Sequence, residues 1–311
     1  MNHAIYTEKL SRRFGKTLAV DAVDLAIPEG AIYALVGANG AGKTTMIKLL
    51  MNIFRPCSGR AEVLGIDTSR LAGKAFTRIG YVSENQEMPE WMTVGAMLAY
   101  FRPFYPTWDR SLEKQLLRQF ELPLDRKLKH LSRGMRMKAA FASSLAYRPS
   151  LIVLDEPFSG LDPLVRDELI ECLLDRAPET TIFLSSHDLA EIESFSSHIG
   201  FLEQGRLLFS EEMPVLSERF REVTVTLESP LPLPGNPPKT WLQPEAVDCV
   251  IRFVHSNYKE QATERELAEF FPGARDISFG PMPLRSIFLA IAKSSRNHSP
   301  AVQEAAKEVV A

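Results

Sequence analysis

The sequence predicts an α/β protein built on a parallel sheet, and three observations support that fold class. A glycine-rich loop at residues 37–45 lies between an apolar, strand-like run and a helix-like run. Residues 151–154 are apolar without alternation, as in a strand that is buried on both faces of a parallel sheet. Residues 181–187 indicate a second buried strand, and both strands end in polar side chains. Because open α/β sheets bind ligands beyond the carboxyl ends of their strands, these polar ends predict a site.

The length and composition are those of an ordinary globular protein with about two domains. The chain has 311 residues, 45% of them hydrophobic and 24% charged, and its formal net charge of -3 gives no reason to expect a nucleic-acid partner. Its three cysteines, Cys57, Cys172 and Cys249, lie far apart, which suits a reducing compartment and gives no metal-binding spacing. The sequence shows neither a secretory signal nor the ~20 consecutive apolar residues of a membrane span. If the protein works at a membrane, we expect another chain to cross it.

The glycine-rich loop fits the phosphate-binding pattern G-x-x-x-x-G-K-[ST]. Glycines let the backbone turn with positive φ and point its N–H groups at phosphate oxygens, and the N-terminus of the following helix adds partial positive charge. Lys43 would reach the β- and γ-phosphates, and the hydroxyl of Thr44 is placed for Mg²⁺. The alternative is a strand–helix turn that binds no ligand. The predicted nucleotide-binding residues of this loop are Gly37, Ala38, Asn39, Gly40, Ala41, Gly42, Lys43, Thr44 and Thr45.

The segments around the loop alternate between strands and turns. Residues 3–36 predict short strands, in which Tyr6 and Phe14 either stack on a purine or join the core. Residues 61–65 indicate an edge strand, and residues 79–83 indicate a short strand that leads into a polar loop.

Residues 90–147 predict a helical subdomain, because helical spacing and aromatic residues replace the strand pattern. We expect the aromatics to form its core, with a docking pocket for a partner as the alternative. These aromatics are Trp91, Tyr100, Phe101, Phe104, Tyr105 and Trp108.

A basic run at residues 126–138 lies within this subdomain and contains no acidic residue. Such a run is usually a solvated face. It surrounds the sequence Leu-Ser-Arg-Gly-Met at residues 131–135, in which Ser132 is suited to cap the helix that follows. A capped helix N-terminus is a second possible phosphate site.

The two strand ends carry the candidate catalytic residues. Asp155 would hold Mg²⁺, while Glu156, which points in another direction, could orient and deprotonate an attacking water. The alternative is that the two acids only cap the next helix. Asp162 lies in the following turn, and His187 ends the second strand beside the expected position of a γ-phosphate.

Together, the phosphate loop, residues 131–135, residues 151–156, the Asp162 turn and His187 resemble the ATP-binding subunit of ABC transporters. The resemblance extends over roughly residues 3–210, and the bacterial exporter type with a separately encoded membrane subunit is the most similar. It implies a P-loop NTPase fold of the ABC type, with an N-terminal antiparallel β layer and a helical subdomain.

The resemblance also implies roles for single residues. Phe14 takes the place of the aromatic that stacks on adenine. Asp155 takes the metal-binding role, Glu156 that of the base, and His187 that of the γ-phosphate sensor. The residues implied to act in trans, on ATP bound to a second subunit, are Ser132, Gly134 and Asp162. These trans contacts imply a head-to-tail dimer that encloses two ATP molecules.

Two features depart from the family pattern. The signature usually reads L-S-G-G-Q, and here Arg133 and Met135 stand in place of a glycine and the glutamine. Glu84 stands where a glutamine commonly links Mg²⁺ and water to the membrane subunit. A carboxylate can still ligate Mg²⁺, and Gln86 is a less suitable substitute.

From about residue 211 the composition changes and predicts a small α+β accessory domain at 211–293 without a catalytic motif. A stiff, proline-rich loop at 230–238 divides it. Strands are expected at 222–227, 248–254 and 275–279, and helices from a capping box at Thr263 to Phe271 and at 284–292. Residues 294–311 predict a flexible tail.

The sequence therefore predicts an ATPase, using ATP and Mg²⁺, of which two identical copies drive export through a transmembrane permease at the cytoplasmic side of the cell membrane. One alternative is a soluble ABC ATPase that acts on the ribosome or nucleic acid, although neither a second ATPase unit nor a long coiled coil is visible. Another is a non-catalytic nucleotide-dependent regulator, which would more naturally have lost Glu156 or His187.

Overall fold

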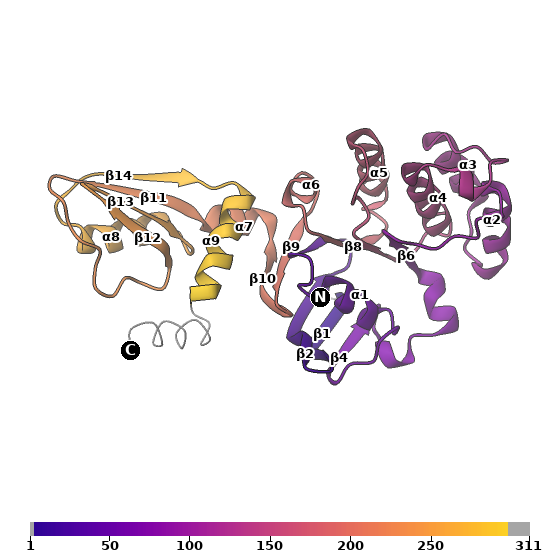
Figure 1. Ribbon diagram of the computed structural model, residues 1–311, viewed down its shortest axis with the longest axis horizontal. Helices are drawn as coiled ribbons and strands as arrows, with labels where there is room; N and C mark the ends of the chain where they lie inside the picture. The colour runs from indigo at the N-terminus through magenta and orange to yellow at the C-terminus, as the bar shows by residue number, and fades with distance from the viewer. Residues whose placement is uncertain (1–2, 298–311) are drawn as a thin grey trace. The chain divides into compact units, whose positions relative to one another are not determined.

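The computed structural model describes residues 3–297, which form two compact units with the boundary between Ser210 and Glu211 (Figure 1). In the first unit a six-stranded sheet has the order β10-β9-β3-β8-β7-β6, and its strands from β9 to β6 run parallel. Every residue of β3, β7 and β8 is buried, which confirms the predicted parallel sheet. The strands are β3 (Ile32–Val36), β6 (Ile79–Ser83), β7 (Leu151–Asp155), β8 (Thr181–Ser186), β9 (His198–Glu203) and β10 (Arg206–Glu212).

A second, four-stranded sheet of order β2-β1-β4-β5 forms the antiparallel layer of this unit. Its strands are β1 (His3–Phe14), β2 (Thr17–Pro28), β4 (Ser58–Val63) and β5 (Ile66–Asp67). Helix α1 (Lys43–Leu50) shares one apolar core with residues of both sheets. The strand predicted at 61–65 is present as β4, but its predicted place at the edge of the sheet was wrong, because the two-residue β5 pairs with its other side.

The helical subdomain contains α2 (Val94–Phe101), α3 (Arg110–Gln119) and α4 (Arg133–Leu145). Its core is mainly aliphatic, and Trp91, Tyr100 and Phe104 are 70%, 54% and 58% exposed. The expectation of an aromatic core was therefore wrong for these three. Helix α2 buries Val94, Met97 and Leu98 at helical spacing, so Tyr100 falls on the other side. Two more helices, α5 (Pro163–Arg176) and α6 (Leu189–Glu193), follow β7 and β8.

In its described part, residues 211–297, the second unit consists of an antiparallel sheet of order β12-β13-β11-β14 and three helices. Its core packs the inner face of the sheet against α8 around Trp241, whose ring stacks on Phe253 at a centroid distance of 4.2 Å. The elements are α7 (Met213–Arg219), β11 (Arg221–Leu227), β12 (Trp241–Val247), β13 (Val250–His255), α8 (Glu260–Phe270), β14 (Ala274–Pro281) and α9 (Leu284–Asn297).

Three features of this unit differ from the sequence expectation. Strand β12 was missed, because Pro244 and a shift of register between Leu242 and Glu245 interrupt its alternation. Helix α8 begins at Glu260, one turn before the expected capping box, and the Oγ1 of Thr263 accepts a hydrogen bond from the Lys259 N–H. Residues 294–297 of the expected tail belong to α9, and residues 298–311 lie outside the described part of the chain.

Within residues 3–297, none of the helices combines the length and the apolarity that crossing a bilayer requires.

Candidate functional site

The glycine-rich loop connects the end of β3 to the start of α1. Gly42 precedes α1 with a φ of 111°, and a Cβ at this position would lie 2.2 Å from the carbonyl oxygen of Ala19. Only glycine fits both the backbone conformation and the space. The side chain of Lys43 is 5% exposed, and its Nζ donates to the carbonyl oxygens of Gly37 at 2.6 Å and Ala38 at 3.3 Å.

Asp155 lies at the carboxyl end of β7 and is buried. Its Oδ1 accepts hydrogen bonds from Ser185 Oγ at 2.7 Å and from Thr44 Oγ1 at 3.1 Å. Burial raises the pKa of Asp155, and the bonds from Ser185 and Thr44 act in the opposite direction. The site therefore presents a carboxylate and hydroxyl oxygens together, which is the ligand chemistry that Mg²⁺ prefers.

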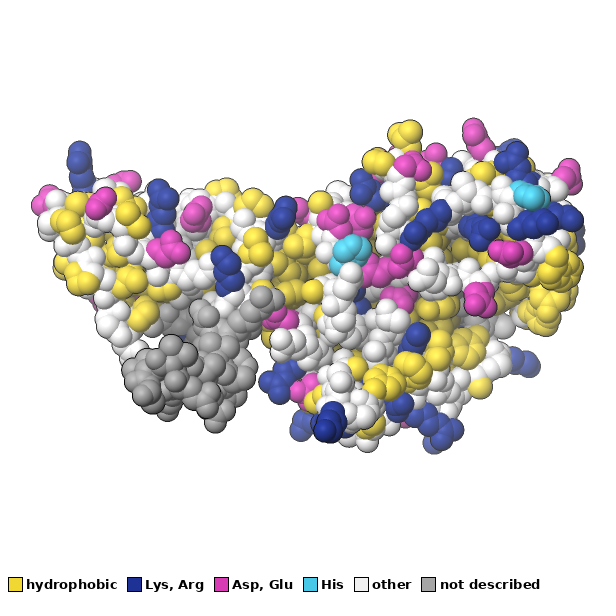
Figure 2. Space-filling model, viewed as in Figure 1, with side chains coloured by type: hydrophobic (Ala, Val, Ile, Leu, Met, Phe, Trp, Pro, Cys, Tyr) yellow, Lys and Arg dark blue, Asp and Glu magenta, His cyan; other side chains and the backbone are white. Residues whose placement is uncertain are grey.

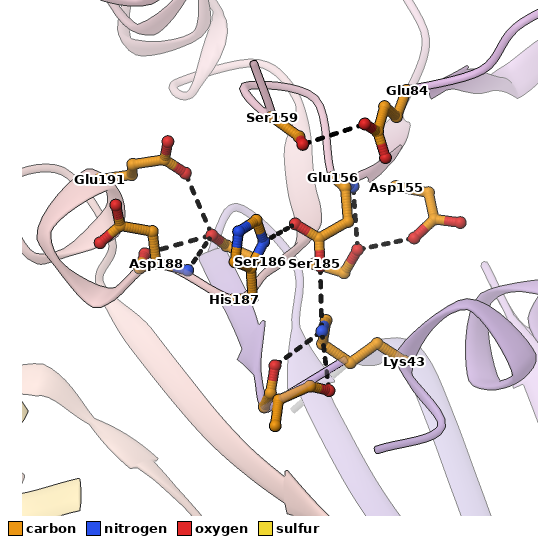
Figure 3. A network of polar contacts seen from close by, with 12 residues as sticks. Lys43, Glu84, Asp155, Glu156, Ser159, Ser185, Ser186, His187, Asp188 and Glu191 are labelled. Atoms are coloured by element: carbon orange, nitrogen blue, oxygen red, sulfur yellow. Dashed lines mark hydrogen bonds and ion pairs between the residues drawn. The ribbon is translucent and has the colours of Figure 1, made fainter. Parts of the chain in front are cut away.

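Glu156 joins the phosphate loop to His187 (Figure 3). Its Oε1 lies 3.0 Å from Lys43 Nζ, and its Oε2 lies 2.7 Å from His187 Nδ1. The backbone of Glu156 has a φ of 51°, and its N–H donates to Ser185 Oγ at 3.0 Å. A non-glycine residue in the left-handed region is uncommon, and here it turns the Glu156 side chain away from that of Asp155.

A second group of polar contacts lies beside His187 (Figure 3). Ser186 Oγ donates to Glu191 Oε2 at 3.2 Å and accepts from the Asp188 N–H at 3.0 Å. Burial raises the pKa of Glu191. Sequence reasoning missed Ser185 and Ser186, although a pair of serines at the end of an otherwise apolar strand was the available signal.

The predicted site residues fall into two sets. Lys43, Thr44, Asp155, Glu156 and His187 come together in the contacts above. In the described residues, no side-chain contact joins the second set to these five residues, although the Glu84 N–H donates to the Asp155 carbonyl at 2.9 Å. The members of the second set are Phe14, Glu84, Ser132, Gly134 and Asp162.

Each member of the second set has its own local setting. Ser132 caps α4 by accepting from the Met135 N–H at 3.2 Å, and Asp162 caps α5 by accepting from the Val165 N–H at 3.1 Å. Gly134 keeps α4 close to α5, since an added Cβ would lie 3.1 Å from the Val165 side chain.

Phe14 ends β1 and is 41% exposed. The guanidinium of Arg12 lies 4.7 Å from the centre of its ring, and Phe54 packs edge-on against it. The side chain of Glu84 is bound through Oε1 by Arg133 and Ser159.

The chain matches known proteins over a region that includes Lys43, Thr44, Asp155 and Glu156 of this site. The profile of the ABC transporter family matches residues 20–159, from β2 through Glu156. The ABC transporter ATP-binding protein YtrB of Bacillus subtilis is 30% identical over 227 residues, which cover 72% of this chain and 77% of that protein. This chain belongs to the ABC transporter family. It is an ATP-binding subunit, and as an ABC ATPase it hydrolyses ATP to drive transport.

Other ABC proteins show the same relationship. The bacitracin transport ATP-binding protein BcrA of Enterococcus faecalis is 30% identical over 72% of this chain and 74% of its own length. A solved structure described as an ATP-binding subunit of an ABC transporter superposes with a TM-score of 0.64 at 26% identity, covering 69% of this chain and 92% of that one. These ABC matches confirm the family and the fold predicted from the sequence.

Proposed function

We propose that two copies of this chain close around two ATP molecules and, by hydrolysing them, drive export through a separately encoded membrane subunit. The observation that carries the proposal is the contact of Glu156 with both Lys43 and His187 at the carboxyl end of β7. The names of two relatives support an export role. One is the bacitracin transport protein BcrA, and the other is the daunorubicin resistance ATP-binding protein DrrA2 of Streptomyces coeruleorubidus, which is 34% identical over 66% of this chain.

The roles proposed within one subunit follow from the contacts of the charged groups. Lys43 exchanges Glu156 and the loop carbonyls for the β- and γ-phosphate oxygens when ATP binds. Glu156, released from Lys43, accepts a proton from the attacking water, while the His187 ring holds its other oxygen in place. Gly37, Ala38, Asn39, Gly40, Ala41, Gly42 and Thr45 complete the proposed phosphate cradle, and Phe14 stacks on adenine.

A magnesium ion fits the oxygens of Thr44 and Asp155, and it would neutralise part of the phosphate charge when bound. Ser185 holds the Asp155 carboxylate in place, because its hydroxyl donates a hydrogen bond to Asp155 Oδ1 and accepts one from the Glu156 N–H. The chain thus holds a metal-binding carboxylate and a catalytic carboxylate on adjacent residues with separate partners.

The proposed trans contacts come from the capped starts of two helices. Ser132 and Gly134 at α4 and Asp162 at α5 would meet the ATP held by the other subunit. ATP can drive closure only by binding the closed dimer more tightly than the open one, and these contacts would supply that difference.

A docking site for the membrane subunit is proposed on the first unit. A cavity of about 350 Å³ is lined by apolar and aromatic side chains, including those of Ile53, Phe101 and Tyr105. Hydrophobic side chains gather over α2 in Figure 2, where Tyr100 is exposed. Such an exposed apolar patch commonly marks a protein–protein contact. Docking here would hold the subunit at the cytoplasmic side of the membrane, and the cargo would be chosen by the membrane subunit.

The test is Glu156→Gln, which keeps the shape of the side chain and removes its basicity. We expect ATP binding to persist, turnover to fall by at least about 100-fold, and an ATP-dependent dimer to accumulate in size-exclusion chromatography with light scattering. Glu171→Gln, on an exposed position of α5, is the matched control and should behave as wild type. Unchanged turnover in Glu156→Gln would remove this residue from the role of base.

A further inference from the structure

The two departures from the family pattern contact each other. Arg133 Nη2 lies 2.7 Å from Glu84 Oε1, and Ser159 Oγ donates to the same oxygen at 3.0 Å. A Cβ on Gly160 would lie 2.9 Å from Arg133 Nη1, so the guanidinium also packs on the loop after β7. Three segments therefore meet at this carboxylate: the loop after β6, the start of α4 and the loop after β7.

Arg133 occupies a position at which its positive charge requires a nearby anion. It is the first residue of α4, whose first turn contains no acidic residue. The N-terminus of a helix carries partial positive charge, so a cation there is unfavourable without a nearby anion. Glu84 is that anion, from a segment 49 residues away in the sequence.

The backbone of Glu84, in contrast, is anchored at the proposed metal site. Ser83 is the register partner of Asp155, and the Glu84 N–H donates to the Asp155 carbonyl at 2.9 Å. Glu84 and Asp155 thus emerge side by side from neighbouring strands (Figure 3). Glu84 and Arg133 also line a cleft of about 740 Å³, which gives the carboxylate room to change direction.

We propose that Arg133 is a positioning residue that holds the Glu84 carboxylate away from Asp155 and Thr44 until the start of α4 moves. In this structure the Glu84 carboxylate points toward Ser159 and Arg133 (Figure 3). It would have to turn away from them to reach a metal ion at Asp155, so the two partners compete. Metal affinity and the position of α4 are then linked, and each changes the other by the same factor. This inference rests on the proposed function, since it assumes the metal site at Thr44 and Asp155.

The size of the expected effect is modest. The Arg133 and Glu84 side chains are 50% and 31% exposed, and ion pairs of that kind shift an equilibrium by only a few fold. We therefore expect that replacing Arg133 tightens metal binding by about threefold, because the Glu84 carboxylate no longer has to break an ion pair before it binds the metal ion.

The experiment measures the affinity for Mn²⁺, as a spin probe of the Mg²⁺ site, by electron paramagnetic resonance with a saturating non-hydrolysable ATP analogue. The variants are Arg133→Gln, Arg133→Lys, Glu84→Gln and the double variant Arg133→Gln/Glu84→Gln. Arg136→Gln is the matched control, since this arginine lies on the same helix and pairs with Glu90 at 3.7 Å instead. Binding of the analogue without metal is measured in parallel, and circular dichroism checks that each variant is folded.

The expected result is tighter Mn²⁺ binding in Arg133→Gln, wild-type affinity in Arg133→Lys and Arg136→Gln, and weaker binding in Glu84→Gln. The double variant should equal Glu84→Gln. Equal affinity in wild type and Arg133→Gln would overturn the proposal. So would the same gain in the Glu84→Gln background, because it would reflect only the loss of a nearby positive charge. Absence of analogue binding in the wild type would instead contradict the proposed function itself.

Discussion

At the scale of single residues, the site satisfies its charges internally. A buried ammonium group is costly unless it is paired and hydrogen-bonded. Lys43 meets this requirement through two loop carbonyls and the carboxylate of Glu156. The proposed base and the proposed phosphate-binding lysine therefore neutralise each other, and under the proposed function ATP replaces one set of contacts with another.

Replacing Lys43 with alanine removes the charged donor that would reach the phosphates. We expect Lys43→Ala to weaken ATP binding by about two orders of magnitude, since charge-assisted hydrogen bonds to phosphate are among the strongest. Titration calorimetry with ATP measures the loss. Lys48→Ala, five residues further along α1, should bind ATP as the wild type does. Full affinity in Lys43→Ala would contradict the assignment of the phosphate loop.

At the scale of elements, capped helix starts recur around the site. Ser132, Asp162 and Asp188 cap α4, α5 and α6, and each accepts a backbone N–H of its own helix. The cap orders the first turn of the helix. The backbone N–H groups of that turn that the cap does not bind remain free at the helix N-terminus, where the helix carries partial positive charge. Ser132 and Asp162 therefore have a structural task besides the trans contacts proposed for them.

The two tasks of Asp162 can be separated by substitution. Asp162→Ala removes the cap of α5 and should lower the free energy of unfolding by about 1 kcal/mol, whereas Asp162→Asn keeps a capping oxygen and should leave it nearly unchanged. Chemical denaturation of the nucleotide-free protein gives both values. If Asp162→Asn is as stable as wild type but forms less ATP-dependent dimer, the carboxylate also acts between subunits. An unchanged free energy of unfolding in Asp162→Ala would show that the cap does not contribute to stability.

At the scale of the whole molecule, the two units have separate apolar cores. An ionisable side chain is buried in the second unit: His255 is 2% exposed, and its Nε2 lies 3.8 Å from Glu266 Oε1. Burial lowers the pKa of His255, and the charge of Glu266 acts in the opposite direction. Trp241 Nε1 donates to the same Glu266 oxygen at 2.7 Å, so the carboxylate is shared.

Acid should therefore destabilise the second unit. Below about pH 6.5, the ordinary pKa of histidine, the unfolded chain binds a proton at His255 that the folded chain does not, so stability is lost as the pH falls. We expect the calorimetric transition of the second unit to move to lower temperature between pH 7.5 and pH 5.5. His255→Gln should reduce that shift. An equal shift in His255→Gln would assign the pH dependence to another group.

The sequence by itself determined the elements whose chemistry is local. The turn at Gly42 needs glycine, the apolar run of β7 needs burial on both faces, and Asp155 and Glu156 follow directly where that strand ends. These constraints act between residues that are neighbours in the chain. For that reason the phosphate loop, the parallel sheet and the family could all be predicted before any contact was known.

Only the tertiary structure decided which distant residues meet. Glu156 and His187 are 31 residues apart, and Glu84 and Arg133 are 49 apart. No local pattern encodes such pairs, because they depend on how strands and helices pack. Packing likewise decided that Tyr100 is exposed, since the sequence shows an aromatic residue at helical spacing but not which side of α2 meets a neighbour. Local sequence thus specified the candidate groups, and long-range packing specified their partners.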